Sequence, residues 1–142
     1  DYAHTPDALK NILSSIDKIR TKNENLLTII GCGGDRDKKK RPKIGEVAAK
    51  FSSKVIFTSD NPRNEDPELI IEEMIRGVSP VDYKKTSIVI KRDEAISTAY
   101  KLSVPGDIVL IAGKGHESFQ EIKGKKYPFN DLEYARKIFT KT

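Results

Sequence analysis

Cysteine, histidine and tryptophan are scarce in this chain. Its 142 residues include one cysteine, two histidines and no tryptophan. A single cysteine cannot form a disulfide within the chain, so a disulfide-stapled secreted scaffold is excluded and a reducing, intracellular setting is favoured. Cys32, His4 and His116 are too few for a zinc site, and neither histidine has an evident partner for nucleophilic catalysis. We therefore expect no metal site and no catalytic residue in this chain.

Long apolar runs are missing as well. The run Ile108–Ala112 is among the longest, and it falls far below the roughly 20 residues that a membrane helix requires. We expect no contact with a membrane. The apolar share of 37% is still enough for a core, and the length suits one ordinary domain, 1–142.

Two phosphate-binding fingerprints are also absent. Gly31 and Gly33 have the spacing that opens a dinucleotide-binding motif, but Arg36 stands where the third glycine would lie. A P-loop is excluded because no glycine lies five residues before Gly113 and Lys114. The chain therefore has no phosphate-binding loop of a known type.

Positive charge is abundant and unevenly distributed. The net charge is +5. Segment 35–43 contains six basic and two acidic side chains, a net charge of +4. Segment 121–126 contains three basic and one acidic, a net charge of +2. The combined charge of the two segments therefore exceeds the net charge of the whole chain. Such a confined excess suits a small anionic ligand at least as well as a nucleic acid. A solvated lysine-rich loop is the plainer alternative.

Helical and strand patterns alternate along the chain. Apolar spacing and capping residues predict helices from 6 to an end between 20 and 23, over 44–51, from 67 to a stop at Gly77, over about 92–102, and from 130 or 131 to 139. Apolar, β-rich runs predict strands over 26–30, 55–58, 86–90 and 107–112, of which 26–30 and 107–112 are expected to be buried, and 119–122 with 126–129 predict a hairpin. We expect an α/β fold with a doubly wound, mostly parallel, Rossmann-like sheet, helices on both faces and a C-terminal hairpin.

Three loops follow predicted strands and carry polar chemistry. They span 31–43, 60–66 and 113–118, and ligands of such sheets bind beyond the carboxyl ends of the strands. Arg63 can present a planar fork to a carboxylate. A ligand carrying both carboxylates and ammonium groups would explain Arg36, Arg63 and Glu117 together. Each residue also has an ordinary interpretation as a surface or turn side chain.

Four ordered motifs resemble the Mur ligase family. They are Asp1-Tyr2-Ala3-His4-Thr5-Pro6, Gly31-Cys32-Gly33-Gly34-Asp35-Arg36-Asp37 with Lys40-Arg41-Pro42, Asp60-Asn61-Pro62-Arg63, and Gly113-Lys114-Gly115-His116-Glu117. The resemblance covers almost the whole chain and is to the C-terminal domain of the members that add meso-diaminopimelate. Lys39 departs from it, since the family commonly has glycine there.

The resemblance implies a cytoplasmic, ATP-dependent ligase of peptidoglycan precursor synthesis. ATP would phosphorylate the D-glutamate carboxylate of UDP-N-acetylmuramoyl-L-alanyl-D-glutamate, and the diaminopimelate amine would attack the acyl phosphate. An N-terminal domain and a central ATPase domain would lie upstream, and the central domain would make most of the contacts to ATP and Mg²⁺. The absence of an initiator methionine agrees with a piece of a longer protein. We expect the piece alone to be inactive.

The resemblance also implies roles for particular residues. Arg63 with Asn61 would hold the distal carboxylate of diaminopimelate, and Arg36 another acidic group. Gly113 with Glu117 would hold the distal ammonium. The full set implied for diaminopimelate is Arg36, Asp60, Asn61, Pro62, Arg63, Gly113 and Glu117.

A second implied site concerns the nucleotide. Asp1 and His4 match a segment that lies beside ATP, with Asp1 as a candidate ribose contact, and the lysines of 38–43 would add a favourable field for phosphates. Two alternatives stay open: a ligase of the same family that adds lysine or another amino acid, and a basic module that binds nucleic acid.

Overall fold

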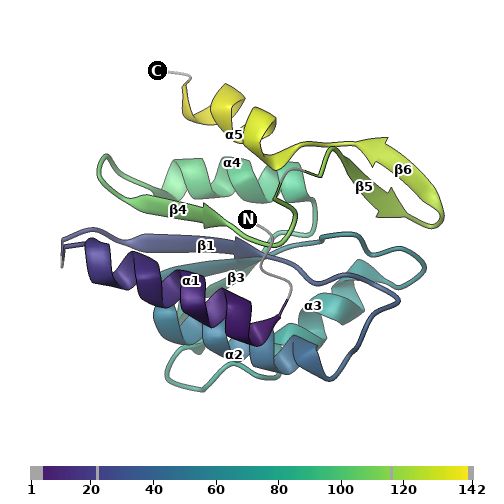
Figure 1. Ribbon diagram of the computed structural model, residues 1–142, viewed down its shortest axis with the longest axis horizontal. Coiled ribbons are helices and arrows are strands. Elements are labelled where there is room, and N and C mark those ends of the chain that lie inside the picture. Colours follow the sequence, from purple (N-terminus) through teal and green to yellow (C-terminus); the bar gives the residue numbers. More distant parts are fainter. Residues whose placement is uncertain (1–4, 22, 116, 141–142) are drawn as a thin grey trace.

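The computed structural model describes residues 5–21, 23–115 and 117–140 (Figure 1). Its helices and strands alternate in the predicted order. They are α1 (Pro6–Ile19), β1 (Leu26–Ile30), α2 (Lys40–Phe51), β2 (Lys54–Phe57), α3 (Pro67–Ile75), the 3-10 turn η1 (Tyr83–Lys85), β3 (Thr86–Ile88), α4 (Arg92–Leu102), β4 (Ile108–Ile111), β5 (Phe119–Ile122), β6 (Lys125–Pro128) and α5 (Asp131–Phe139).

The main sheet has four strands in the order β3-β2-β1-β4, and every neighbouring pair is parallel. From β1 the chain passes through α2 to β2 on one side, and from β3 it passes through α4 to β4 on the other side of β1. The strand order therefore reverses between β1 and β4. In open α/β sheets the ligand crevice forms at this reversal, beyond the carboxyl ends of the strands.

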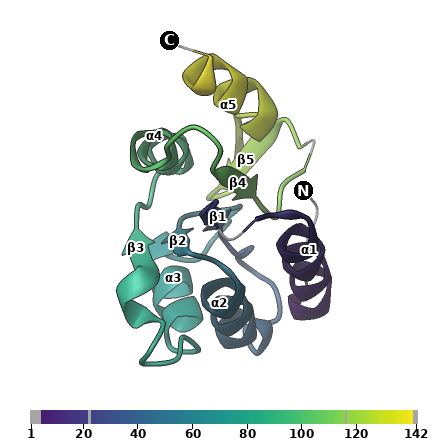
Figure 2. The same cartoon turned by 90° about the vertical axis from the view of Figure 1, so that its left-hand side faces the viewer.

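Helices cover both faces of this sheet (Figure 2). On one face, α1, α2 and α3 pack against Leu26 and Ile30 of β1. On the other face, α4 and α5 pack against Leu27 and Ile29 of the same strand. Every residue of β1 is buried, as its continuous apolar run predicts. The predicted doubly wound α/β class is confirmed.

Element ends explain two departures from the predicted pattern. The helix predicted from Ile44 begins at Lys40, because Pro42 fits within a first helical turn. Gly77 follows α3 as predicted, but its backbone is not left-handed. A Cβ at Gly77 would lie 1.7 Å from the carbonyl oxygen of Pro42, so close approach of α2 and α3 explains this glycine.

The last strand of the sheet and the hairpin complete the frame of the site. β4 pairs with β1 and lies at the sheet edge, so its residues are half-buried rather than buried as predicted. β5 and β6 form the predicted antiparallel hairpin, with Lys123 and Gly124 both at positive φ in the turn. The hairpin attaches to the second loop through a parallel bridge between Arg63 and Ile122.

Candidate functional site

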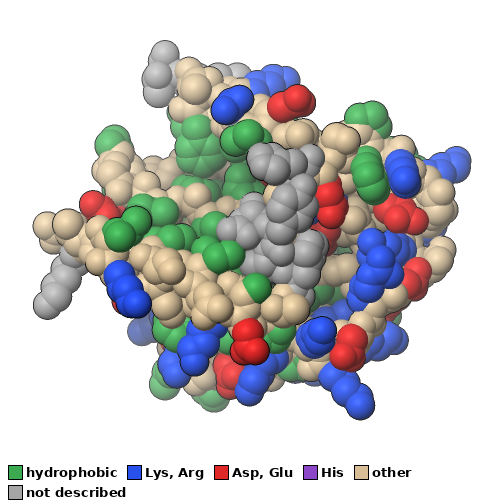
Figure 3. All heavy atoms as spheres, in the orientation of Figure 1, with side chains coloured by type: hydrophobic (Ala, Val, Ile, Leu, Met, Phe, Trp, Pro, Cys, Tyr) green, Lys and Arg blue, Asp and Glu red, His purple; other side chains and the backbone are tan. Residues whose placement is uncertain are grey.

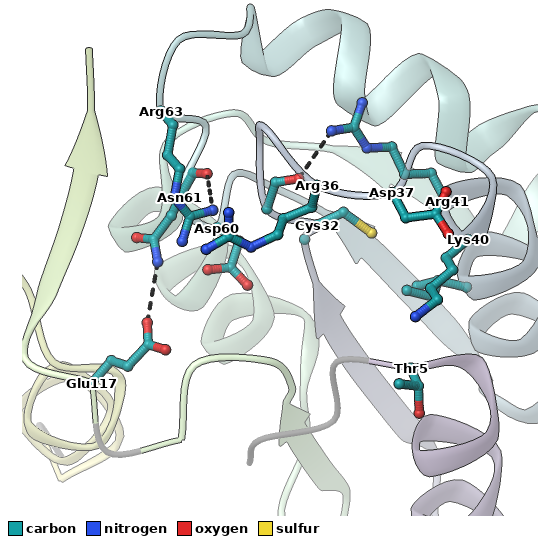
Figure 4. Close-up of a pocket in the computed structure, with 13 residues that line it drawn as sticks. Thr5, Cys32, Arg36, Asp37, Lys40, Arg41, Asp60, Asn61, Arg63 and Glu117 are labelled. Atoms are coloured by element: carbon teal, nitrogen blue, oxygen red, sulfur yellow. Dashed lines mark hydrogen bonds between the residues drawn. The ribbon is translucent and has the colours of Figure 1, made fainter. Parts of the chain in front are cut away.

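A cavity of about 460 Å³ opens beyond the carboxyl ends of β1 and β2 (Figure 4). All three predicted loops contribute to its wall. It is lined by Thr5, Gly31, Cys32, Gly33, Arg36, Asp37, Lys40, Arg41, Ile44, Asp60, Asn61, Arg63 and Glu117. The cavity at the carboxyl ends of the strands therefore contains five of the seven residues predicted to bind the amino acid.

Close backbone contacts hold the first two loops together. A Cβ at Gly31 would lie 2.5 Å from the carbonyl oxygen of Thr58, and one at Gly33 would lie 2.9 Å from Nη1 of Arg63. The Gly34 N–H donates to the Asn61 carbonyl at 2.7 Å. A side chain at Gly31 would push the two backbones apart, and one at Gly33 would displace the Arg63 guanidinium, so both glycines let the arginine lie beside the first loop.

The hairpin holds Arg63 in an unusual backbone conformation, with φ of 51°. The Arg63 N–H donates to the Glu121 carbonyl at 3.0 Å, and the Arg63 carbonyl accepts from Lys123 N at 2.7 Å. Left-handed backbone is unfavourable for a residue other than glycine, so it persists only where surrounding contacts hold it. The hairpin therefore fixes the backbone position from which the Arg63 side chain extends.

The guanidinium of Arg63 is held through two of its three nitrogens, Nη1 and Nε. Its Nη1 donates to the carbonyl of Gly34 at 2.9 Å, and its Nε lies 3.4 Å from a carboxylate oxygen of Glu121. Among the described residues no hydrogen bond involves Nη2. The side chain is only 18% exposed, and it points toward the cavity (Figure 4).

Asn61 and Glu117 come from different loops and meet at one wall of the cavity. Asn61 Nδ2 donates to Glu117 Oε1 at 3.2 Å (Figure 4). The amide oxygen of Asn61 accepts from the backbone N–H of Glu121 at 2.9 Å. The structure thus brings an amide donor and a carboxylate from separate loops to one wall.

Asp60 is 4% exposed and lines the same cavity. Gly113, at φ of 109°, lies against it, because a Cβ there would be 2.9 Å from Asp60 Oδ2. Gly113 and Pro62 do not line the cavity. Each instead packs beside a residue of the site: Gly113 lies against Asp60, and the Pro62 backbone lies against Gly34. A Cβ on Gly34 would lie 1.8 Å from the Pro62 carbonyl oxygen.

Arg36 differs from Arg63 in being exposed. Its Nη1 donates to the carbonyl of Asp35 at 3.1 Å, and its side chain lines the cavity (Figure 4).

Lys39, the departure from the family pattern, has φ of −64° and ψ of −26°. This is ordinary helical backbone, so the position does not require glycine.

Two charged residues were missed as parts of this site by sequence reasoning. Lys114 is fully buried and contacts Asn61 and Glu117. Arg41 is 2% exposed and binds the carboxylate of Glu65 at 2.8 Å. The only signals in the sequence were the glycines on either side of Lys114 and the Lys40-Arg41-Pro42 motif.

Arg41 also corrects the interpretation of the basic segment. Besides Glu65, its guanidinium binds Glu73 at 2.6 Å and the Gly33 carbonyl at 2.9 Å. Lys38 lies 3.7 Å from Glu65. Part of the excess charge of 35–43 is therefore neutralised by acidic residues that lie far away in the sequence.

Replacing Glu65 by glutamine should lower the free energy of unfolding of this chain by about 1–2 kcal/mol at neutral pH. The Arg41 guanidinium lowers the pKa of Glu65 from 4.5 to about 2. Stabilisation by a carboxylate with a lowered pKa is complete above the ordinary value and is lost as the pH falls toward the folded-state value. Urea unfolding of both proteins should therefore show a difference that shrinks between about pH 4.5 and pH 2. A difference unchanged by pH contradicts this role, and Glu72→Gln controls for loss of an exposed carboxylate.

Cys32 lines the cavity but is nearly inaccessible, at 8% exposure. Burial, together with the nearby charge of Asp60, raises the pKa of its thiol to about 12. The thiol is therefore protonated at neutral pH, and it serves as a small packing residue.

Charged side chains on the face of the molecule drawn in Figure 3 are mixed in sign. Lys and Arg side chains lie among Asp and Glu over α1, α2 and the hairpin rather than in one continuous stripe (Figure 3). Over 5–21, 23–115 and 117–140, no group of three or more His, Cys, Asp or Glu residues could hold a metal ion. In the same ranges no helix is both long and apolar enough to cross a membrane. Asp1 and His4, predicted to contact ATP, lie outside the described residues.

Comparison with known proteins identifies the class. The family model "Mur ligase, glutamate ligase domain" matches residues 1–115, so the chain belongs to the Mur ligase family. It is similar to the UDP-N-acetylmuramoyl-L-alanyl-D-glutamate--2,6-diaminopimelate ligases of Cytophaga hutchinsonii and Bacteroides thetaiotaomicron. It is 56% identical to the first over 92% of this chain and 51% identical to the second over 98%. These matches span 27% and 29% of the two relatives.

Solved structures agree with this placement. A structure of a ligase with the same name has a TM-score of 0.90 and 42% identity, covering 98% of this chain and 28% of its own. A murein peptide ligase of Psychrobacter arcticus has a TM-score of 0.58 over 78% of this chain at 15% identity, so it supports the fold alone.

Proposed function

We propose that this chain, as a single domain over 1–142, selects the amino acid for an ATP-dependent ligase that adds meso-diaminopimelate to UDP-N-acetylmuramoyl-L-alanyl-D-glutamate. The observation that supports this most is the content of the cavity. The groups that line it include the guanidinium groups of Arg36 and Arg63, the amide of Asn61 and the carboxylates of Asp60 and Glu117. Its charges of both signs suit a ligand that carries carboxylates and ammonium groups.

The distal carboxylate of diaminopimelate would lie between Arg63 and Asn61. Nη2 of Arg63 can donate to one carboxylate oxygen, and Nδ2 of Asn61 can donate to the other. Lysine has no carboxylate at this position. It would leave Nη2 of the half-buried guanidinium without an acceptor, and an unmade hydrogen bond at a buried charged group is costly.

The distal ammonium would lie against Glu117 and Asp60. Both bonds to Glu117 given by the described residues go to Oε1, which leaves Oε2 for the ligand. Arg36, at the mouth, would bind another acidic group of the amino acid. This arrangement would place the reacting amine away from the cavity floor, toward the rest of the enzyme.

Activation of the carboxylate would depend on upstream domains. The chain has no P-loop, so the central domain would make most of the contacts to ATP and Mg²⁺. Asp1 and His4 of this chain would lie beside the nucleotide. ATP would supply the phosphoryl group of an acyl phosphate. The residues of this chain would bind and orient the attacking amino acid. Because ATP and the UDP-linked substrate are cytoplasmic, we place the enzyme in the cytoplasm.

The proposal is tested by the amino-acid requirement of the full-length protein, measured as release of phosphate from ATP. We expect activity with meso-diaminopimelate and a loss of roughly 100-fold or more in kcat/KM with 2-aminopimelate, which lacks the distal ammonium. The 142-residue chain alone should give no turnover. Equal use of 2-aminopimelate contradicts the proposed ammonium site. Salt-sensitive binding of oligonucleotides at physiological ionic strength, with no amino-acid-dependent turnover, would instead favour a nucleic-acid module.

A further inference from the structure

Lys114 is a buried cation that contacts residues of the cavity wall without lining the cavity itself. Its side chain is 0% exposed, and its Nζ donates to Asn61 Oδ1 at 2.8 Å and to Glu117 Oε1 at 3.1 Å. Asp60 Oδ1 lies 3.6 Å away. A buried ammonium is costly unless it is paired and hydrogen-bonded. Here the partners are three of the groups that line the cavity, so the lysine is tied to the site rather than to the general core.

We propose that Lys114 is a positioning residue that sets the amino-acid specificity of this cavity. It fixes the direction of the Asn61 amide, and it offsets one of the two carboxylates that face the ligand ammonium. This inference rests on the proposed function, because it assigns Asn61 and Glu117 to the distal end of diaminopimelate.

The direction of the Asn61 amide follows from its partners. Its oxygen accepts from Lys114 Nζ and from the backbone N–H of Glu121 at 2.9 Å. An ammonium and a backbone N–H can only donate, so the reversed amide would set donors against donors. Nδ2 is therefore held toward Glu117 and the cavity, where it can donate to a ligand carboxylate. Without the lysine, the amide oxygen would keep only the Glu121 N–H as a donor, and the bond from Nδ2 to Glu117 would be the other contact orienting the amide.

The charge balance gives the second part of the argument. Asp60 and Glu117 carry two negative charges beside Lys114, while Arg63 is paired with Glu121. With Lys114 present, the wall around Asp60 and Glu117 carries one net negative charge, which matches one ligand ammonium. Without it, two carboxylates would remain for that ammonium. The attraction for an ammonium would persist while recognition of the carboxylate weakened.

The two effects predict a change in selectivity. Lysine has the distal ammonium but lacks the distal carboxylate. Replacing Lys114 by methionine should therefore impair use of meso-diaminopimelate more than residual use of lysine. We expect the ratio of kcat/KM for meso-diaminopimelate to that for lysine to fall at least about tenfold, mainly through KM for diaminopimelate. KM for ATP should stay near its original value.

The test uses Lys114→Met in the full-length ligase, with Lys101→Met, an exposed lysine of α4, as the matched control. Thermal unfolding of each variant establishes that it folds. If Lys114→Met does not fold, Lys114→Gln keeps a donor for Asn61 while removing the charge, and the selectivity ratio should fall in the same direction by a smaller factor. In an Asn61→Leu background, Lys114→Met should change the ratio far less than in the original enzyme.

The outcomes separate the proposals. An equal loss of activity with both amino acids, at an unchanged ratio, would overturn the positioning role and leave Lys114 as a purely structural residue. Independent, additive effects of Lys114→Met and Asn61→Leu on the ratio would overturn it too. Failure of the unaltered ligase to use meso-diaminopimelate would instead overturn the proposed function itself, and this inference with it.

Discussion

Replacing Arg63 by alanine in the full-length ligase should raise KM for meso-diaminopimelate roughly 30- to 700-fold while kcat and KM for ATP change little. Arg63 is held at 18% exposure by Gly34 and Glu121, so its side chain needs little reorganisation to meet a carboxylate. Truncating one member of such a charge pair costs about 2–4 kcal/mol, and about 1.4 kcal/mol corresponds to tenfold in affinity. A contact made equally in the bound and transition states affects KM rather than kcat.

Two further variants sharpen this test. Arg63→Lys keeps the charge but loses the planar fork, so its KM should lie between those of the original enzyme and Arg63→Ala. Arg76→Ala removes an exposed arginine after α3 and should leave KM for diaminopimelate unchanged. Steady-state kinetics with diaminopimelate as the varied substrate supply the measurement. A large fall in kcat at constant KM would show that Arg63 acts on the chemical step instead of on binding.

The second large effect concerns a buried ion pair on the other face of the sheet. Arg92, the first residue of α4, binds Asp131 of α5 through Nε and Nη2, both at 2.7 Å. The same guanidinium donates to the carbonyls of Ser59 and Ala112 at 3.1 Å. These carbonyls immediately precede Asp60 and Gly113. The pair therefore joins the two strand ends that lead into the site to the C-terminal helix.

Asp131→Ala should reduce the free energy of unfolding of this chain by about 3–5 kcal/mol, because it leaves the Arg92 charge buried without its partner. This is a large share of the stability of an ordinary domain. The measurement is urea unfolding followed by circular dichroism. Asp131→Asn retains a hydrogen-bond acceptor and should cost less. Glu133→Ala, which removes an exposed carboxylate of the same helix, should be nearly neutral. A loss below about 1 kcal/mol in Asp131→Ala would show that the pair contributes little to stability.

Sequence patterns were sufficient for the fold where one local signal dominated. Thr5 and Pro6 begin α1 as predicted, with Thr5 Oγ1 accepting from the Ala8 N–H at 3.1 Å. Asn130 caps α5 in the same way. The start of α2 was missed because a lysine-rich segment with a proline has the composition of a loop. The half-buried state of β4 was missed because an apolar run is the same at the edge of a sheet as at its centre.

The candidate site was predictable only in part for a related reason. Arg36, Asn61 and Arg63 lie in loops after strands, where the topology collects ligand-binding residues, and their motifs could be recognised. Arg41 is buried against two carboxylates from remote segments, and Lys114 is buried against remote Asp60 as well as nearby Glu117. Nothing local to either residue indicates burial, and a lysine or arginine in a polar loop is ordinarily exposed.

The central claim is that this cavity selects the amino acid by its distal carboxylate, and one ratio tests it most directly. It is kcat/KM for meso-diaminopimelate divided by kcat/KM for L-lysine, measured in the full-length ligase and in Arg63→Ala. We expect a preference of roughly 100-fold or more for diaminopimelate in the original enzyme, and its collapse toward equality in the variant. Comparable use of lysine by the original enzyme, or a preference that survives in Arg63→Ala, would contradict the account.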